Sequence, residues 1–403
     1  MQIKRIRKRI RKIISPLRRF LHSNQSSGLI LLAAVVVSLI WANSSNSSHY
    51  FNLLNSEWGI NISSFSLIKT TEHWINDGLM CFFFLMVGLE IKRELIIGEL
   101  SEIKQASLPI IAALGGMIIP ALFYIVINLN SDAKSGWAIP MATDIAFALA
   151  VLGLLGKRIP LSLKIFLAAL AIVDDLGAIL IIAIFYTETI SFTYLLGAGV
   201  CVLFLIALNY FKFYKIVYYI PFGIILWFCI YKSGIHATIA GVLFAFTIPM
   251  EKEENSTLIR LENFLHTPVN YFIMPIFAMA NTGIVLSPEL FKQLLSPLGW
   301  GISAGLIVGK PLGISLFSYL AIKFKLAVLP LKVNKRQLLG VGVLAGIGFT
   351  MSVFIALLSF KDLEHQNIAK LSILLTSIVA GVLGSIILLY STKKVISKSE
   401  NGN

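Results

Sequence analysis

Charged side chains are scarce in this chain. They make up 13% of its 403 residues, whereas an average soluble domain carries about 25%. Hydrophobic residues make up 57%, and the mean hydropathy is +0.83. This composition excludes an ordinary soluble domain and favours an integral membrane protein of the helical type.

Acidic residues and cysteines are also few. Asp and Glu total 20 against 34 Lys and Arg, for a net charge of +14, but nine of these bases lie within the first twenty residues. The rest of the chain therefore carries only about +5, and we expect no binding to nucleic acid. Cys81, Cys201 and Cys229 all lie within apolar runs, which argues against a disulfide framework.

The basic residues at the start form an N-terminal arm over residues 1–20. Its apolar residues recur at helical spacing, which suits a helix lying on the anionic lipids of a cytoplasmic leaflet. A disordered topology signal is the alternative. The apolar run Gly28 to Trp41 that follows also resembles a signal peptide, but Trp41-Ala-Asn-Ser44 lacks the small-x-small cleavage pattern. We therefore take this run as the first membrane helix.

The apolar segments predict an all-α polytopic membrane protein with about twelve transmembrane helices. After the first run they lie at about 74–97, 107–128, 137–155, 161–186, 192–211, 216–231, 235–249, 260–284, 299–322, 336–359 and 367–391. Lys and Arg cluster in every second connection, so the positive-inside rule places both termini in the cytoplasm. We expect a transmembrane domain over 21–392 and a polar cytoplasmic tail over 393–403.

Residues 43–72 are polar, and Trp58-Gly-Ile-Asn61 has the composition of a turn between short alternating stretches. We expect a small periplasmic β-hairpin at about 50–70. Isolated hairpins are only marginally stable, so this one would support a homodimer.

Two of the expected helices are interrupted. Pro140 and Asp144 fall within the fourth, and Gly340, Gly346 and Gly348 fall within the eleventh. Proline removes a backbone donor and glycine weakens a helix, so both are candidate breaks. The breaks occupy matching places in residues 107–186 and 299–391. Such a match indicates an inverted-repeat transporter with two broken, crossing helices.

Two adjacent carboxylates, Asp174 and Asp175, lie in the middle of the apolar run from Leu161 to Tyr186. Each costs about 2.5–3.5 kcal/mol at the centre of a membrane helix. Such residues usually mark an ion or proton path, although pairing with a buried cation for structure alone is the alternative. Burial and a like-charged neighbour both favour the neutral carboxyl form, so protons and Na⁺ could compete for the pair.

Seven motifs, in order along the chain, resemble those of the bacterial NhaA sodium/proton antiporters. They are Trp74-Ile-Asn-Asp-Gly-Leu-Met80, Val87-Gly-Leu-Glu-Ile-Lys-Arg-Glu94, Ala142-Thr-Asp-Ile-Ala-Phe147, Ala171-Ile-Val-Asp-Asp-Leu-Gly177, Lys232-Ser-Gly-Ile-His-Ala-Thr238, Gly309-Lys-Pro-Leu-Gly313 and Gly346-Ile-Gly-Phe-Thr-Met351. The resemblance implies a bacterial inner-membrane protein that exchanges cytoplasmic Na⁺ or Li⁺ for external H⁺. It implies electrogenic, pH-regulated transport, with no cofactor and no enzymatic activity.

The same resemblance implies roles for individual residues. Asp174 and Asp175 would bind Na⁺ and protons. Asp144 and Thr143 would lie at the helix crossing, and Lys310 would be a buried lysine. The residues of the implied pH response are Glu90, Arg93, Glu94, His236, Glu262 and His266.

Each of these roles has a simpler alternative. Asp144 could cap the second half-helix instead of binding Na⁺, and Lys310 could extend to the cytoplasmic surface. The spacing of Glu90, Arg93 and Glu94 also suits ordinary surface ion pairs, while His236 and His266 could be packed histidines. The chain also departs from the family pattern: Asn263 stands where a second histidine is usual, and the basic arm is longer.

Three other function classes share part of this pattern. An intramembrane aspartyl protease needs its two aspartates on separate helices, usually with a Gly-x-Gly-Asp motif. A prenyl-transferring enzyme needs Asp-Asp-x-x-Asp, which Leu176-Gly-Ala178 interrupts. A passive cation channel remains an alternative function, because two broken helices also occur in channels.

Overall fold

A computed structural model describes residues 24–62, 65–187, 190–250, 256–330 and 333–400. The predicted all-α polytopic fold is confirmed: helices make up most of these residues, and two strands form the sheet found among them. The basic arm predicted over 1–20 lies outside the described residues.

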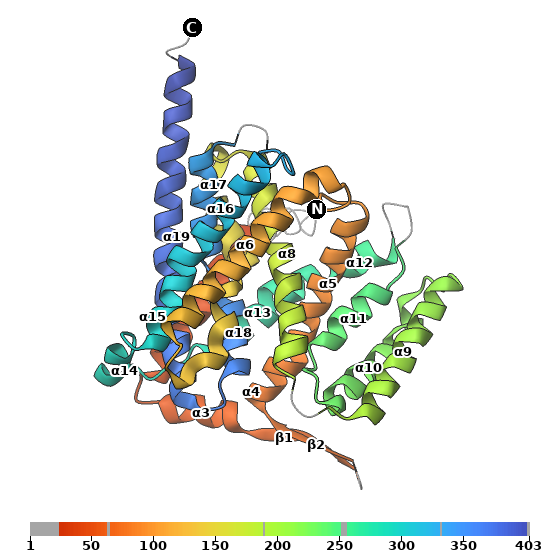
Figure 1. The fold of residues 1–403 in the computed structure, drawn as a ribbon. Coiled ribbons are helices and arrows are strands. Elements are labelled where there is room, and N and C mark those ends of the chain that lie inside the picture. Colours follow the sequence, from red (N-terminus) through yellow and green to blue (C-terminus); the bar gives the residue numbers. More distant parts are fainter. Residues whose placement is uncertain (1–23, 63–64, 188–189, 251–255, 331–332, 401–403) are drawn as a thin grey trace, which may run out of the picture.

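Helices of the bundle lie side by side, with the two strands projecting from one end (Figure 1). We call this end the hairpin face. Uninterrupted helices are α2 (Asn24–Ala42), α6 (Ile103–Ile127), α8 (Leu161–Phe185), α9 (Phe192–Tyr210), α10 (Ile220–Ser233), α11 (Ile239–Thr247) and α19 (Leu363–Glu400). Short helices in the connections are α3 (Ser47–Asn55), α4 (Thr71–His73), η3 (Gly156–Arg158), η4 (Ile216–Tyr218) and α14 (Pro288–Gln293).

The other predicted spans are built from consecutive helical pieces. A π-helix occurs in three of them: η1 (Trp74–Leu79) leads into α5 (Met80–Ile96), η5 (Val269–Ile273) joins α12 (Thr257–Pro268) to α13 (Met274–Asn281), and η6 (Gly305–Gly309) joins α15 (Pro297–Ala304) to α16 (Lys310–Lys323). Among the described residues, six helices are long and apolar enough to cross a membrane, or up to nine spans if each bent pair counts as one.

Both predicted helix breaks are confirmed. The 3₁₀ helix η2 (Asp132–Met141) and α7 (Ile145–Leu154) meet at 46°, and so do α17 (Lys335–Ala345) and α18 (Phe349–Ser359). Glycine lets the two breaks approach closely, because a Cβ on Gly348 would lie 2.1 Å from Ser352 Oγ and 3.2 Å from the Ala142 carbonyl oxygen. The breaks therefore cross in contact with each other.

Close backbone packing also sets the position of α16 against α6. A Cβ on Gly115 would lie 2.3 Å from the Gly313 carbonyl oxygen, and a Cβ on Gly313 would lie 2.0 Å from that of Gly115. Only glycine at both positions permits this approach. It places the first turn of α16, which begins with Lys310, against the centre of the bundle.

The expected hairpin is present, but its predicted limits were wrong. Strands β1 (Glu57–Ile62) and β2 (Phe65–Thr70) pair antiparallel, with Gly59 opposite Ile68, and residues 47–55 form α3 instead of a strand. The segment Trp58–Asn61, predicted as the turn, lies within β1. In β1 the apolar residues Trp58, Ile60 and Ile62 alternate with Gly59 and Asn61, and this period of two favours a strand over a turn.

Helix α19 continues well past the predicted end of the last span. It runs without a break to Glu400, through most of the segment expected as a polar tail, and extends beyond the rest of the bundle (Figure 1).

Candidate functional site

The adjacent aspartates lie in the interior of α8, and both are buried, with 1% and 2% of their surface exposed. Neighbouring side chains on a helix point about 100° apart. Asp174 and Asp175 therefore face different surroundings, and the structure separates their contacts completely.

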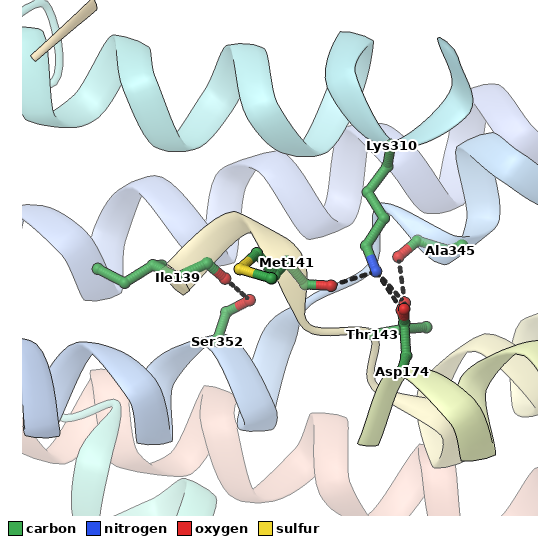
Figure 2. A network of polar contacts seen from close by, with 7 residues as sticks. All are labelled: Ile139, Met141, Thr143, Asp174, Lys310, Ala345 and Ser352. Carbon is green, nitrogen blue, oxygen red and sulfur yellow. Dashed lines mark hydrogen bonds and ion pairs between the residues drawn. The ribbon is translucent and has the colours of Figure 1, made fainter. Parts of the chain in front are cut away.

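Asp174 forms an ion pair with Lys310, and neither side chain is exposed (Figure 2). The Lys310 ammonium also donates to the Thr143 hydroxyl oxygen, at 2.6 Å, and to the Met141 carbonyl oxygen. These three acceptors use all three hydrogens of the ammonium group. The predicted buried position of Lys310 is confirmed, and extension to the surface was the wrong alternative.

The helix breaks supply the remaining oxygens around Lys310. Thr143 accepts from the ammonium, and its single hydroxyl hydrogen can go to Asp174 Oδ2 at 2.6 Å or to the Ala345 carbonyl oxygen at 3.0 Å. Met141 ends η2 and Ala345 ends α17, so both carbonyls come from interrupted helices. A half-helix C-terminus carries partial negative charge, which suits a buried cation.

Lys310 reaches this position through an irregular turn. Lys310 directly follows the π-helix η6, and its backbone N–H donates to the carbonyl of Gly305, the first residue of that helix. Pro311 follows with no N–H of its own. A π-turn widens the helix locally, and such turns are frequent at functional sites. The sequence did not predict this turn.

Asp144 caps both of the half-helices that begin at the crossing. Its Oδ1 accepts from the Phe147 N–H of α7 at 2.9 Å, and its Oδ2 accepts from the Thr350 N–H of α18 at 3.1 Å and from the Thr350 hydroxyl. Its own N–H donates to the Ile347 carbonyl at 2.7 Å. The geometry therefore matches the capping alternative, and a carboxylate between two helix N-termini also offsets their positive partial charges.

Asp175 lines a cavity of about 130 Å³. We call this space the acidic cavity, because carboxyl groups from three helices and from the first helix break border it. Its polar lining consists of Ser27, Glu90, Asp144, Asp175, Glu262, His266, Asn270 and Thr350. This volume is enough to hold several waters.

The expected pH-response residues divide into two groups. Arg93 donates to both carboxylate oxygens of Glu262 at 3.0 Å and pairs with Glu94 at 2.7 Å. Glu262 also borders the acidic cavity, together with Glu90 and His266. This first group therefore connects to Asp175 through one continuous space, which the spacing of residues within α5 and α12 could not show.

His236 belongs to a different place. Its Nε2 lies 3.4 Å from Asp77, whose carboxylate also lies 3.1 Å from His73 Nε2, and its Nδ1 contacts the Thr238 hydroxyl at 2.8 Å. His236 does not line the acidic cavity. Sequence reasoning missed Asp77 and His73 as its partners, although Asp77 lies within one of the quoted motifs.

Thr350 and Asn270 are the other residues that sequence reasoning left without a role. Thr350 lies within one quoted motif, and its bonds to Asp144 join the two breaks. No motif includes Asn270.

The family model described as Na⁺/H⁺ antiporter 1 matches residues 18–388 of this chain. The chain belongs to this family. A relative named Na(+)/H(+) antiporter NhaA from Flavobacterium psychrophilum is 49% identical over 391 residues, covering 97% of this chain and all of the relative. Relatives of the same name from Pelagibacter ubique and Escherichia coli are 48% and 50% identical, over 96% and 91% of this chain and 100% and 96% of theirs.

Membership in this antiporter family confirms the resemblance seen in the motifs. It also agrees with a multi-pass helical membrane protein. The lengths covered extend over the acidic cavity, both helix breaks and the Lys310–Asp174 pair, so all of these features lie within the part shared with the antiporters.

Proposed function

We propose that this member of the Na⁺/H⁺ antiporter family exchanges Na⁺ or Li⁺ for protons by competition at Asp174 and Asp175. The observation that carries this proposal is one unused oxygen on each carboxylate. Oδ1 of Asp174 and Oδ1 of Asp175 are both buried and have no hydrogen-bond partner. A buried oxygen without a donor is costly unless a proton or a cation binds it.

A hard cation suits the atoms at this position. Na⁺ prefers oxygen ligands, as Ca²⁺ and Mg²⁺ do. Asp174, Thr143 and the carbonyls of Met141 and Ala345 bring such oxygens together, and Asp175 adds another from the acidic cavity. Protons and Na⁺ then neutralise the same carboxylates in turn, and this alternation couples the two fluxes.

Lys310 makes the exchange electrogenic. When Na⁺ binds Asp174, it takes the place of the ammonium. Two cations on one buried carboxylate would leave one positive charge uncompensated in a medium of low dielectric constant, which is costly. Lys310 then releases a proton, and Asp175 releases another as the ion approaches. More protons than sodium ions move in each cycle. The cycle uses only transported ions, with no cofactor and no enzymatic step.

The remaining features concern the orientation of the protein in the membrane, its response to pH and its contact with lipids. With both termini in the cytoplasm of a bacterial inner-membrane protein, the acidic cavity would open toward the cytoplasm and the hairpin face toward the periplasm. Arg93 and its carboxylate partners would adjust the charge of the cavity with pH. Anionic lipids would bind the basic N-terminal arm.

The hairpin would hold a homodimer. Trp58 of β1 stacks on Trp74 of η1 with ring centroids 5.4 Å apart, and 56% of the Trp58 surface is exposed. Replacing residues 57–70 by a short Gly-Ser linker should leave a folded monomer in light-scattering measurements. A dimer of unchanged size would contradict this assignment.

A pH-dye assay in everted membrane vesicles tests the exchange itself. Addition of Na⁺ should collapse an imposed proton gradient when the unchanged protein is present, and choline should not. Asp175→Asn should abolish the response, whereas Asp132→Asn, at an exposed position before the first break, should keep it. A passive cation channel would instead respond to voltage without moving protons.

A further inference from the structure

Asn270 is a polar residue of the acidic cavity that the exchange described above does not use. It lies half-buried in the π-helix η5, and it lines the cavity together with Glu90, Glu262 and Asp175. None of the hydrogen bonds found among the described residues involves its side-chain amide. The amide is therefore available to whatever occupies the cavity.

The backbone of Asn270 is also short of partners. In a regular helix its carbonyl would accept from the Met274 N–H, but that N–H bonds to the Val269 carbonyl instead. In the π-type register the next donor would be residue 275, which is Pro275 and has no N–H. The main-chain carbonyl oxygen of Asn270 therefore has neither of these helical donors. The side-chain amide oxygen is a second oxygen without a hydrogen bond among those found in the described residues.

Four of the carboxylate oxygens bordering the cavity are already committed. Both oxygens of Asp144 accept hydrogen bonds at the helix crossing, and both oxygens of Glu262 accept from Arg93. Asp175 differs, because its Oδ1 is buried without a partner and the residue is only 2% exposed. A cation in the cavity would thus find uncommitted oxygens at Asn270 and Asp175, and also at Glu90, whose carboxylate accepts none of the hydrogen bonds found among the described residues.

The narrowness of the cavity favours a protein ligand for an entering ion. In a space of about 130 Å³, protein oxygens can replace part of the water around the ion. A hard cation that loses waters needs neutral or anionic oxygens to replace them, and amide carbonyls are among the ligands that such ions use. A neutral amide also holds a cation less tightly than a carboxylate, which suits a position the ion must leave.

We propose that Asn270 forms a transit subsite for Na⁺ in the acidic cavity, where its amide oxygen binds the partly dehydrated ion before Asp175 receives it. This inference rests on the proposed exchange function. Asn270 acts on how readily the ion is captured, while Asp174, Asp175 and Lys310 determine the proton exchange.

Exchange kinetics in proteoliposomes test this assignment. Asn270→Ala should raise the apparent KM for Na⁺ about tenfold, a loss of about 1.4 kcal/mol in binding, with the maximal rate within about twofold of the unchanged protein. Asn270→Ser, which keeps an oxygen, should recover part of this loss. The matched control is Phe272→Leu in the same π-helix, where the side chain is 63% exposed and should not affect KM.

A second measurement covers the case in which Asn270→Ala folds poorly. Na⁺-dependent thermal stabilisation of the detergent-purified protein reports binding without transport. Asn270→Ser should need a higher Na⁺ concentration than the unchanged protein for the same stabilisation. An unchanged KM in Asn270→Ala, or an unchanged Na⁺ dependence in Asn270→Ser, would overturn the subsite while leaving the exchange function intact. Absence of Na⁺-driven proton movement in the unchanged protein would overturn both.

Discussion

Asp144, in the first broken helix, accepts hydrogen bonds from both the backbone N–H and the hydroxyl of Thr350 in the second. Because its other oxygen accepts from Phe147, one buried carboxylate caps half-helices of both broken helices. The crossing is thus joined by hydrogen bonds as well as by close packing of glycine. Any change at Asp144 acts on both breaks together.

Removing this double cap should destabilise the protein more than removing an ordinary one. The loss of one cap costs about 0.5–2 kcal/mol. We expect Asp144→Ala to lower the free energy of unfolding by more than that range, because two helix ends lose their acceptor. Ser296→Ala, which removes the single cap of α15, is the control. Thermal unfolding in detergent measures both, and lost Na⁺ binding at unchanged stability would make Asp144 a cation ligand instead.

Changing Glu262 should move the pH profile of exchange without abolishing transport. Glu262→Gln removes one negative charge from the border of the acidic cavity and leaves Arg93 paired with Glu94. Proton release from Asp175 becomes easier when a nearby negative charge is removed, so the profile should shift toward lower pH by about half a unit or more. The measurement is the exchange rate against pH in vesicles, with the exposed Glu102→Gln as control. A complete loss of Na⁺ binding at every pH would place Glu262 within the binding site.

Asp362 should make the start of α19 sensitive to acid. Its carboxylate accepts from the His365 backbone N–H at 2.9 Å and contacts the His365 ring at 2.7 Å, and these bonds, the backbone one first, hold the pKa of Asp362 below its ordinary value. A lowered folded-state pKa gives stability that is present above the unfolded-state pKa of about 3.9 and lost as pH falls through the folded-state pKa.

Asp362→Asn tests this sign. The amide still caps α19 but does not titrate, so the acid-dependent loss below about pH 4 should disappear. The effect should be below about 1 kcal/mol, because 56% of the Asp362 side chain is exposed to solvent. Hydrogen exchange in the first turn of α19, followed between pH 3 and 6, measures it. An equal acid dependence in both proteins would contradict the assignment.

Local sequence signals predicted the features that depend on neighbouring residues. Pro140 and the glycines around Gly346 identified both breaks, because proline and glycine weaken any helix that contains them. The same local reasoning wrongly placed the hairpin turn at Trp58–Asn61. These residues have the composition of a turn, but their apolar and polar side chains alternate as in a strand, and they form part of β1.

Contacts between distant parts of the chain were not accessible in this way. Periodicity along residues 71–79 could not show that Asp77 lies between His73 and His236, since His236 lies far away in the sequence, in the connection between α10 and α11. The π-helices were also missed, although η6 positions Lys310 and η5 carries Asn270. Such turns depend on how a helix packs against its neighbours, and the pattern of apolar residues in the sequence does not predict this packing.

The Asp174–Lys310 pair determines whether exchange moves net charge. Removing either partner alone leaves a buried charge without compensation, which typically costs about 3–5 kcal/mol. Asp174→Asn with Lys310→Gln removes both charges, and the amides can still hydrogen-bond to Thr143 and the Met141 carbonyl. We therefore expect the double variant to fold. Its thermal stability should be closer to that of the unchanged protein than the thermal stability of either single variant is.

Transport by this double variant gives the decisive measurement. Without Lys310 the second proton has no carrier, so any remaining exchange through Asp175 should be electroneutral, and the alternative consistent with the mechanism is no exchange at all. Proteoliposomes with an imposed membrane potential separate these cases, because only electrogenic exchange changes its rate with voltage. Voltage-dependent Na⁺/H⁺ exchange by the double variant would show that Lys310 does not carry the extra proton.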